Sequence, residues 1–264
     1  MVPLLTAERG CIGVAGFLLL LLIESVRPFR PEGPGGWRRR LINIFIASTN
    51  ALLLSVVLGG LLVSAYHACE LYRFGLLAAL GIGGWANVAL TVVALDGVTY
   101  AWHRAYHGLP ALWRMHRVHH SDQALDVTTS GRFHLTEMGL SALFRLGVIA
   151  LLGASVAGVV IFEIVFGLFN QLEHANLRLP PRLDARLRAV VVTPDMHRIH
   201  HFQQAGYTNS NYSTIFSFWD RLFGTYVFGP DQRATPIGLP EYARASDVTL
   251  ERVLVMPFGP PCAI

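Results

Sequence analysis

Three histidine clusters contain the residues of this chain that are best suited to metal chemistry. They are His103-Arg-Ala-Tyr-His107, His116-Arg-Val-His119-His120 and His197-Arg-Ile-His200-His201. Within each cluster, histidines three or four residues apart fall on one face of a helix. Neutral imidazole nitrogens that converge from fixed backbones are suited to binding transition metals. The clusters therefore predict a metal site.

The number of clustered histidines indicates how many metals the site holds. Clusters of two, three and three histidines give eight ligands, which is too many for one ion and enough for two ions with open positions. A closed structural zinc site uses four ligands and commonly includes cysteine, but no cysteine lies near the clusters. Imidazole suits iron, copper, nickel or zinc. The spacing therefore predicts a di-metal site and leaves the metal open.

Residues outside the clusters are candidates to complete or support this site. His174 follows an apolar stretch that would carry it to the same layer, so it is predicted as a ninth ligand. His134 is either a ligand or a support for a neighbouring ligand or for Glu137. Acids near the clusters either hold an imidazole in place or serve as helix caps and solvated charges. The candidates for a supporting role are His134, Asp96, Asp195 and Asn211, and Asp122 and Glu173 also lie near the clusters.

The composition indicates a single membrane-embedded domain over residues 1–264. Hydrophobic residues make up 53% of the chain and charged residues only 14%, whereas soluble domains carry about 25% charged residues. The formal charge is +4, but the arginines flank apolar spans instead of forming one stripe, which argues against a nucleic-acid partner. Cys11, Cys69 and Cys262 are far apart and predict neither a disulfide framework nor a thiolate metal site.

Apolar runs predict about three crossing helices and a helical hairpin. The three spans are expected at Cys11–Val26, Leu41–Tyr66 and Phe74–Val98, and a turn at His67–Arg73 joins the last two. Residues 27–40 hold five arginines and one acid, so this short loop should face the cytoplasm.

The apolar stretch Met138–Phe169 is longer than one crossing requires, and Gly153 and Gly158 lie near its middle. A single crossing would place the third histidine cluster on the opposite face from the other two. Two half-length helices in a hairpin would bring it back, which is the arrangement that we expect. Residues 178–190 are predicted to form an arginine-rich surface segment, and residues 203–264 contain no further span.

From about Asp96 to Tyr226, the chain resembles the fatty acid hydroxylase and sterol desaturase superfamily. The resemblance rests on the three clusters and on the surrounding motifs. These are Leu112-Trp113-Arg114, Arg132-x-His134-x-x-Glu137, Thr193-Pro194-x-Met196, Asn211-Tyr212 and Phe218-Trp219-Asp220-Arg221-Leu222-Phe223-Gly224-Thr225-Tyr226. Leu135 stands where the family commonly has proline, and Ser213 where it commonly has glycine. Neither departure removes a candidate ligand.

The resemblance implies an all-α integral-membrane fold with a cytoplasmic helical cap that holds two iron ions, for which zinc is a possible substitute. It also implies hydroxylation or desaturation of a lipid C–H bond with dioxygen as co-substrate. The two electrons would come from a separate electron-transfer protein. We expect a multi-pass protein of the bacterial inner membrane with the metal site on the cytoplasmic side.

Three alternatives remain open at this point. One is a zinc-dependent membrane hydrolase, and another is a lipid-binding protein that keeps the metals for stability. The third, a carotenoid ring hydroxylase, differs only in its substrate. The residues do not distinguish between hydroxylation and desaturation.

Overall fold

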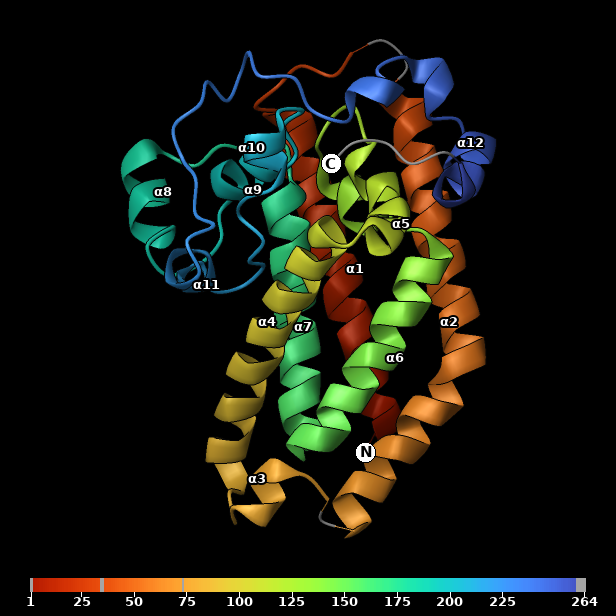
Figure 1. Ribbon diagram of the computed structural model, residues 1–264, viewed down its shortest axis with the longest axis vertical. Coiled ribbons are helices and arrows are strands. Elements are labelled where there is room, and N and C mark those ends of the chain that lie inside the picture. Colours follow the sequence, from red (N-terminus) through yellow and green to blue (C-terminus); the bar gives the residue numbers. More distant parts are fainter. Residues whose placement is uncertain (1, 34–35, 73, 260–264) are drawn as a thin grey trace.

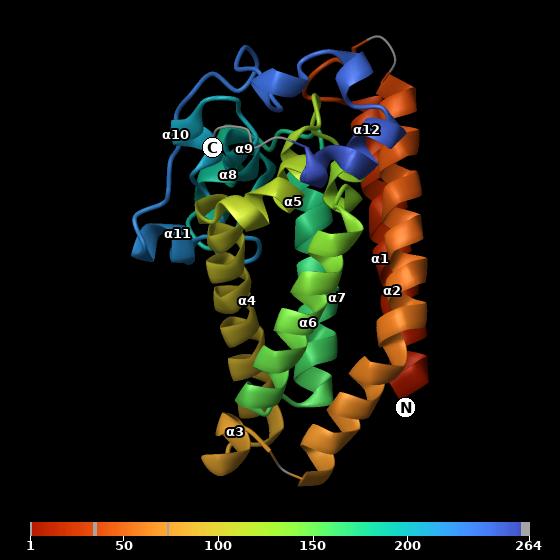
Figure 2. The same ribbon diagram turned by 45° about the vertical axis from the view of Figure 1, so that its right-hand side comes forward.

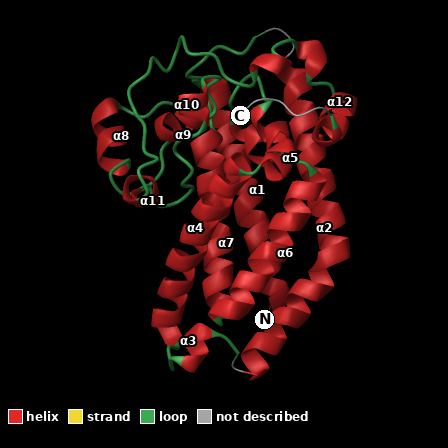
Figure 3. Cartoon of the chain, in the orientation of Figure 1, coloured by secondary structure: helices red, strands yellow, loops and turns green. Residues whose placement is uncertain are grey.

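The apolar runs form long helices that lie side by side, with a helical cap at one end of the bundle. A computed structural model describes residues 2–33, 36–72 and 74–259 (Figures 1 and 3). Within these ranges there is no β-strand, and only two isolated bridges, Val191 to Phe216 and Phe202 to Ile237, join extended segments. The predicted all-helical fold is confirmed.

Five long helices make up the bundle in the described part of the chain. They are α1 (Val2–Val26), α2 (Gly36–Tyr72), α4 (Gly84–Gly108), α6 (Leu135–Leu152) and α7 (Val156–His174). Four contain a segment that is long and apolar enough to cross a membrane, at Glu8–Val26, Gly36–Leu61, Leu135–Leu152 and Val156–His174. The shortest of these segments has 18 residues, and 18 residues of helix measure about 27 Å. The chain is therefore built as a multi-pass membrane protein.

The connection between the second and third long helices differs from the predicted one. Helix α2 continues through most of the expected turn and ends at Tyr72, and a short helix α3 (Leu76–Ala79) follows. The predicted span Phe74–Val98 is interrupted because Gly81 and Gly84 adopt positive φ angles of 68° and 57°, which break a right-handed helix. Helix α4 therefore begins ten residues later than expected and extends to Gly108.

The helical hairpin is confirmed and consists of α6 and α7. Gly153 ends α6 in the left-handed conformation, with φ of 70°, and Ser155 caps α7 through a hydrogen bond from Gly158 N (3.1 Å). Both arms are longer than half-length, because α6 begins at Leu135 and α7 continues to His174. The hairpin returns the chain to the end of the bundle at which it entered (Figure 2).

The cap gathers the short elements that lie between and after the long helices (Figures 1 and 2). Its α-helices are α5 (Pro110–His120), α8 (Pro181–Leu187), α9 (Pro194–His200), α10 (Ala205–Thr208), α11 (Phe218–Leu222) and α12 (Leu250–Val255). Its 3-10 turns are η1 (Val127–Gly131), η2 (Pro240–Tyr242), η3 (Ala245–Asp247) and η4 (Met256–Phe258). As expected, no span follows α7 up to residue 259, where the described part ends.

The core that positions the cap lies between α4, α6 and α7. Leu95, Ile149, Val159 and Phe162 are buried there and pack together, while α1 packs against α7. Cys11 is a free, exposed thiol. Cys262 and the side chains of His67 and Cys69 lie outside the described residues, so the expectations for them are not examined by the structure.

Candidate metal centre

The nine histidines predicted as ligands lie together in the cap in two groups. The five-histidine group consists of His103, His107, His116, His120 and His200, and the four-histidine group consists of His119, His174, His197 and His201. Within each group the candidate ligand atoms all lie within 4.8 Å of one another. Helices α4, α5, α7 and α9 supply these side chains, with His201 following directly after α9.

Helix geometry explains which histidines share a group. His116 and His120 are four residues apart on α5 and belong to the same group, because residues at that spacing lie on one helix face. His119 lies next to His120 but is rotated by about 100° around the helix axis, and it belongs to the four-histidine group. His200 and His201 are divided between the groups in the same way.

Pairs of Nε2 atoms approach each other at the spacing expected of ligands on a shared metal. Two imidazole nitrogens bound side by side to one ion, each at about 2.0–2.1 Å, would lie about 3 Å apart. In the five-histidine group, Nε2 of His103 is 3.1 Å from Nε2 of His116. In the four-histidine group, the Nε2 distances are 3.1 Å for His119–His174, 3.1 Å for His174–His197 and 3.2 Å for His197–His201.

Backbone carbonyl oxygens orient three of the rings. A carbonyl oxygen can only accept a hydrogen bond, so each contacting Nδ1 must carry the hydrogen and Nε2 keeps its lone pair. The contacts are His103 to Tyr212 (2.8 Å), His174 to Asn170 (2.6 Å) and His200 to Ser210 (2.7 Å). The protein therefore fixes these imidazoles in the tautomer that leaves Nε2 available to a metal.

Two buried glutamates on the hairpin arms face the histidines from the membrane side. Oε1 of Glu137 accepts a 2.6 Å hydrogen bond from Nδ1 of His116. Glu173 is farther from its neighbours, with oxygens 3.6 Å from Nδ1 of His197 and 3.9 Å from Nδ1 of His174. Glu137 therefore supports the five-histidine group directly, and Glu173 places negative charge beside the four-histidine group.

Burial and unpaired nitrogens suit the site to a metal. Eight of the nine histidines are buried, and His103 is partly buried. Burial, assisted by neighbouring imidazoles, lowers the pKa of the histidines of α5 and α9, and that of His201, well below the ordinary 6.5. Nε2 of His107, His120 and His200 has no hydrogen-bond partner among the described residues. Neutral, unpaired buried nitrogens fit a bound cation, since a buried polar atom is otherwise costly to leave unsatisfied.

Asp96, one of the candidate supporting residues, holds the C-terminal segment against α4. Its carboxylate accepts hydrogen bonds from Ile215 N (3.2 Å), Phe216 N (3.1 Å) and the Trp219 indole Nε1 (2.8 Å). Within the described residues, no hydrogen bond links it to any of the nine histidines. Asp96 therefore does not support a candidate ligand directly; it acts on the segment around Ile215.

Asp195 and Asn211 both contact α9, the first through a side chain and the second through the backbone. Asp195 lies at its first turn and pairs with Arg198 (2.7 Å), three residues later. Asn211 adopts a positive φ of 53°, and its side-chain amide donates to the Met196 carbonyl (2.9 Å), directly before His197. Asn211 therefore positions α9 through its backbone, whereas Asp195 acts within α9 through the side chain of Arg198.

His134 lies outside both groups, at the N-terminus of α6. Its Nδ1 accepts a hydrogen bond from Thr136 N (3.2 Å), and its Nε2 contacts the Leu254 carbonyl (3.1 Å). It therefore caps the helix that carries Glu137, and no hydrogen bond in the described part of the chain joins it to a candidate ligand.

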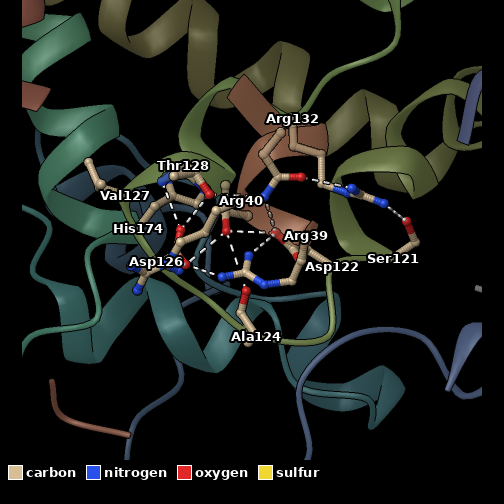
Figure 4. A network of polar contacts seen from close by, with 12 residues as sticks. Arg39, Arg40, Ser121, Asp122, Ala124, Asp126, Val127, Thr128, Arg132 and His174 are labelled. Atoms are coloured by element: carbon tan, nitrogen blue, oxygen red, sulfur yellow. Dashed lines mark hydrogen bonds and ion pairs between the residues drawn. The ribbon is translucent and has the colours of Figure 1, made fainter. Parts of the chain in front are cut away.

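A polar network joins the start of α2 to the segment that follows α5 (Figure 4). Arg39 pairs with Asp122 (2.8 Å) and with Asp126, and Asn43 donates to Asp122 (2.8 Å). Burial acts to raise the pKa of Asp126, but Arg39, Arg40 and the hydrogen bonds from Thr128 together hold that pKa below the ordinary value. Asp122 therefore fastens α2 to the cap instead of contacting an imidazole.

A cavity of about 350 Å³ reaches both histidine groups from the membrane side. His103 and His116 line it from the five-histidine group, and His119, His174 and His197 line it from the four-histidine group. Farther into the bundle its wall is largely apolar and includes Leu95, Val98, Met138, Ala142, Phe144 and Phe166. This arrangement can hold an alkyl chain with one carbon beside the candidate metal centre.

Comparisons with known proteins agree with this geometry. The fatty acid hydroxylase family model matches residues 88–225. An ornithine lipid hydroxylase of Rhizobium tropici is 32% identical over 58% of this chain and 45% of its own length. An alkylglycerol monooxygenase of Danio rerio is 30% identical over 84% of this chain and 48% of its own length. The chain thus spans about half the length of these curated relatives. No solved structure gives a significant match.

Proposed function

The chain belongs to the fatty acid hydroxylase family, and on that premise we propose that it hydroxylates a membrane lipid with dioxygen at a pair of iron ions. The observation that carries this proposal is the juxtaposition of two histidine groups and one apolar cavity that contacts both. The named relatives act as lipid hydroxylases or monooxygenases, which supports the choice of reaction over desaturation.

The nine histidines are the proposed ligands of the two ions. The five-histidine group would hold one ion and the four-histidine group the other. When bound, the metal pair supplies the redox chemistry that lets dioxygen attack an unactivated C–H bond. In the overall reaction one oxygen atom enters the C–H bond and the other leaves as water, with two electrons and two protons taken up.

The protein's own residues would orient the imidazole rings and the alkyl chain and exclude bulk water. The carbonyl contacts of His103, His174 and His200 keep each Nε2 aimed at its group, and the carboxylate of Glu137 does the same for His116. The apolar wall of the cavity would align an alkyl chain and keep bulk water from the reacting carbon.

We place the cap on the cytoplasmic side, in a bacterial inner membrane. The end of α1, the described residues after it and the start of α2, which together carry the five arginines of residues 27–40, lie at the cap end of the bundle (Figure 1), and short loops with excess arginine stay in the cytoplasm. There the centre is within reach of a separate electron-transfer protein, which we propose as the source of the two electrons.

The decisive test combines metal analysis with lipid analysis. Purified protein should hold two iron ions per chain and, with a reductant, add one oxygen atom to a lipid, with the label incorporated from ¹⁸O₂. His197→Ala should reduce the metal content and abolish the product. Zinc as the active metal, together with ester cleavage and no oxygen uptake, would instead identify a hydrolase. Wild-type metal content in His197→Ala would contradict the assigned ligands.

A further inference from the structure

An ion pair joins the two arms of the membrane hairpin within the bundle. Nη1 of Arg145 on α6 lies 2.8 Å from Oε1 of Glu163 on α7, and Nη1 of Arg9 on α1 lies 3.5 Å from Oε2 of the same glutamate. Both Arg145 and Glu163 lie well inside segments apolar enough to cross a membrane. Charged side chains at that depth are costly and are usually functional.

The pair lies at the deep end of the cavity that reaches the histidines. Along α4, α6 and α7, the lining residues farthest from the cap are Leu95, Arg145 and Glu163. Arg145 is eight residues from Glu137, and Leu95 is eight from His103, so both lie about 12 Å below the histidine layer. Glu163 is ten residues from Glu173, or about 15 Å. Three helices thus place the cavity floor at a similar depth.

The surroundings of Arg145 hold its guanidinium in place, so that the ion pair forms a fixed polar floor at the deep end of the cavity. Its guanidinium lies 5.0 Å from the ring centre of Phe166 and 5.6 Å from that of Phe162. Ring stacking on one side and the carboxylate on the other restrict the guanidinium. An alkyl chain that continued past this point would have to separate the pair, which would leave the Arg145 guanidinium without its carboxylate in a largely apolar wall.

We propose that the Arg145–Glu163 ion pair sets the length of alkyl chain that this site accepts beyond the oxidised carbon. An extended chain advances about 1.25 Å per carbon, so a depth of about 12–15 Å corresponds to about 10–12 carbons. The assignment of the oxidised carbon rests on the proposed function. The limit on chain length rests on the cavity alone.

The test measures binding and does not require turnover. Full-length protein in nanodiscs is labelled with a dodecanoic acid that carries a diazirine on its terminal carbon, and saturated fatty acids from octanoic to octadecanoic acid compete for labelling. For the wild type, competition should strengthen up to about dodecanoic acid and then stop improving. Peptide mass spectrometry should locate the label on α6 or α7, near Arg145 or Phe166.

Replacing both charged residues together should deepen the cavity and raise the limit on chain length. With Arg145→Leu and Glu163→Leu combined, the chain length at which competition stops improving should increase by up to about four carbons, or one helical turn of about 5.4 Å. The exchange of the two charges, Arg145→Glu with Glu163→Arg, should keep the wild-type limit. Arg9→Gln is the matched control, because Arg9 contacts Glu163 but does not line the cavity.

The outcomes separate this proposal from the proposed function. An unchanged chain-length limit in the folded double leucine variant would overturn the proposal, and so would a wild-type label located away from α6 and α7. If the double leucine variant does not fold, the location of the wild-type label still decides. The predicted limit in a protein that never oxidises lipid would refute the proposed function and leave this assignment in place.

Discussion

Replacing Glu137 with glutamine should weaken metal binding at the five-histidine group by about tenfold. The carboxylate accepts a 2.6 Å hydrogen bond from Nδ1 of His116 and is only 3% exposed, so water cannot substitute for it. A hydrogen bond to a charged group contributes about 1.5–3 kcal/mol and a neutral one about 0.5–1.5 kcal/mol. The loss of about 1.4 kcal/mol corresponds to a factor of about ten. Leucine, which cannot accept the hydrogen bond, should cost up to about a hundredfold.

The assay is titration of the metal-free protein with Co²⁺ against a competing chelator. Glu173→Gln is the matched control, since Glu173 is also a buried hairpin glutamate but lies 3.6 Å from the nearest histidine Nδ1, beyond hydrogen-bonding distance. Its effect should be clearly smaller than that of Glu137→Gln. Wild-type affinity in Glu137→Gln, or a larger loss in Glu173→Gln, would refute the assigned support.

Other perturbations address the ligands, the polar network and the hairpin. His174→Ala should lower the metal content toward a single ion, whereas His134→Ala should leave it unchanged; elemental analysis checks both. Arg39→Met should destabilise the protein by about 3–5 kcal/mol, as expected when a buried charge loses its partner, and unfolding measurements check this. The destabilisation should shrink as the pH falls below about 3.9. In that range Asp126 binds a proton more readily in the unfolded chain than in the fold, where its pKa is lowered, so the ion pair contributes less to stability. Gly75→Ala should cost about 1–3 kcal/mol in thermal unfolding, because its φ of 108° is strained for alanine and a Cβ there would meet the backbone of Gly153 at the hairpin turn; wild-type stability would contradict this.

The sequence predicted the histidines that come together because their spacing is a local property. Pairs four residues apart, such as His103 and His107, share a helix face whatever the tertiary fold. His174 was predicted from the hairpin, whose turn at Gly153 follows from the length of an apolar stretch and a helix-ending glycine. The division of the nine histidines into five and four was not predicted, since it depends on how α4, α5, α7 and α9 approach one another.

Most of the groups that hydrogen-bond to the histidine rings could not be predicted from the sequence. Every residue has a backbone carbonyl, so nothing in the side chains of Asn170, Ser210 or Tyr212 marks their carbonyls as partners of histidines. Glu137 carried a recognisable signal, a carboxylate three residues after His134, and was considered only in connection with that residue. Proximity to a cluster in the sequence makes Asp96 a candidate support, but in the fold its carboxylate holds the C-terminal segment instead.

The two histidine groups differ in what holds them. Residues 209–212 contact three members of the five-histidine group, through the Asn209 side chain to His107 (3.3 Å) and through the carbonyls of Ser210 and Tyr212.

That short segment has its own supports. The Asp220 carboxylate accepts Tyr212 N (2.8 Å) and Ser213 N (3.0 Å). Asn211 takes a left-handed conformation that asparagine tolerates better than most residues. The Asn-Tyr and Trp-Asp motifs thus shape a loop whose backbone orients candidate ligands. The four-histidine group receives its carbonyl contact from α7 itself, at Asn170. Changes in the C-terminal loop should therefore disturb the five-histidine group first, whereas changes in the hairpin should reach both groups, because its two arms carry Glu137 and His174.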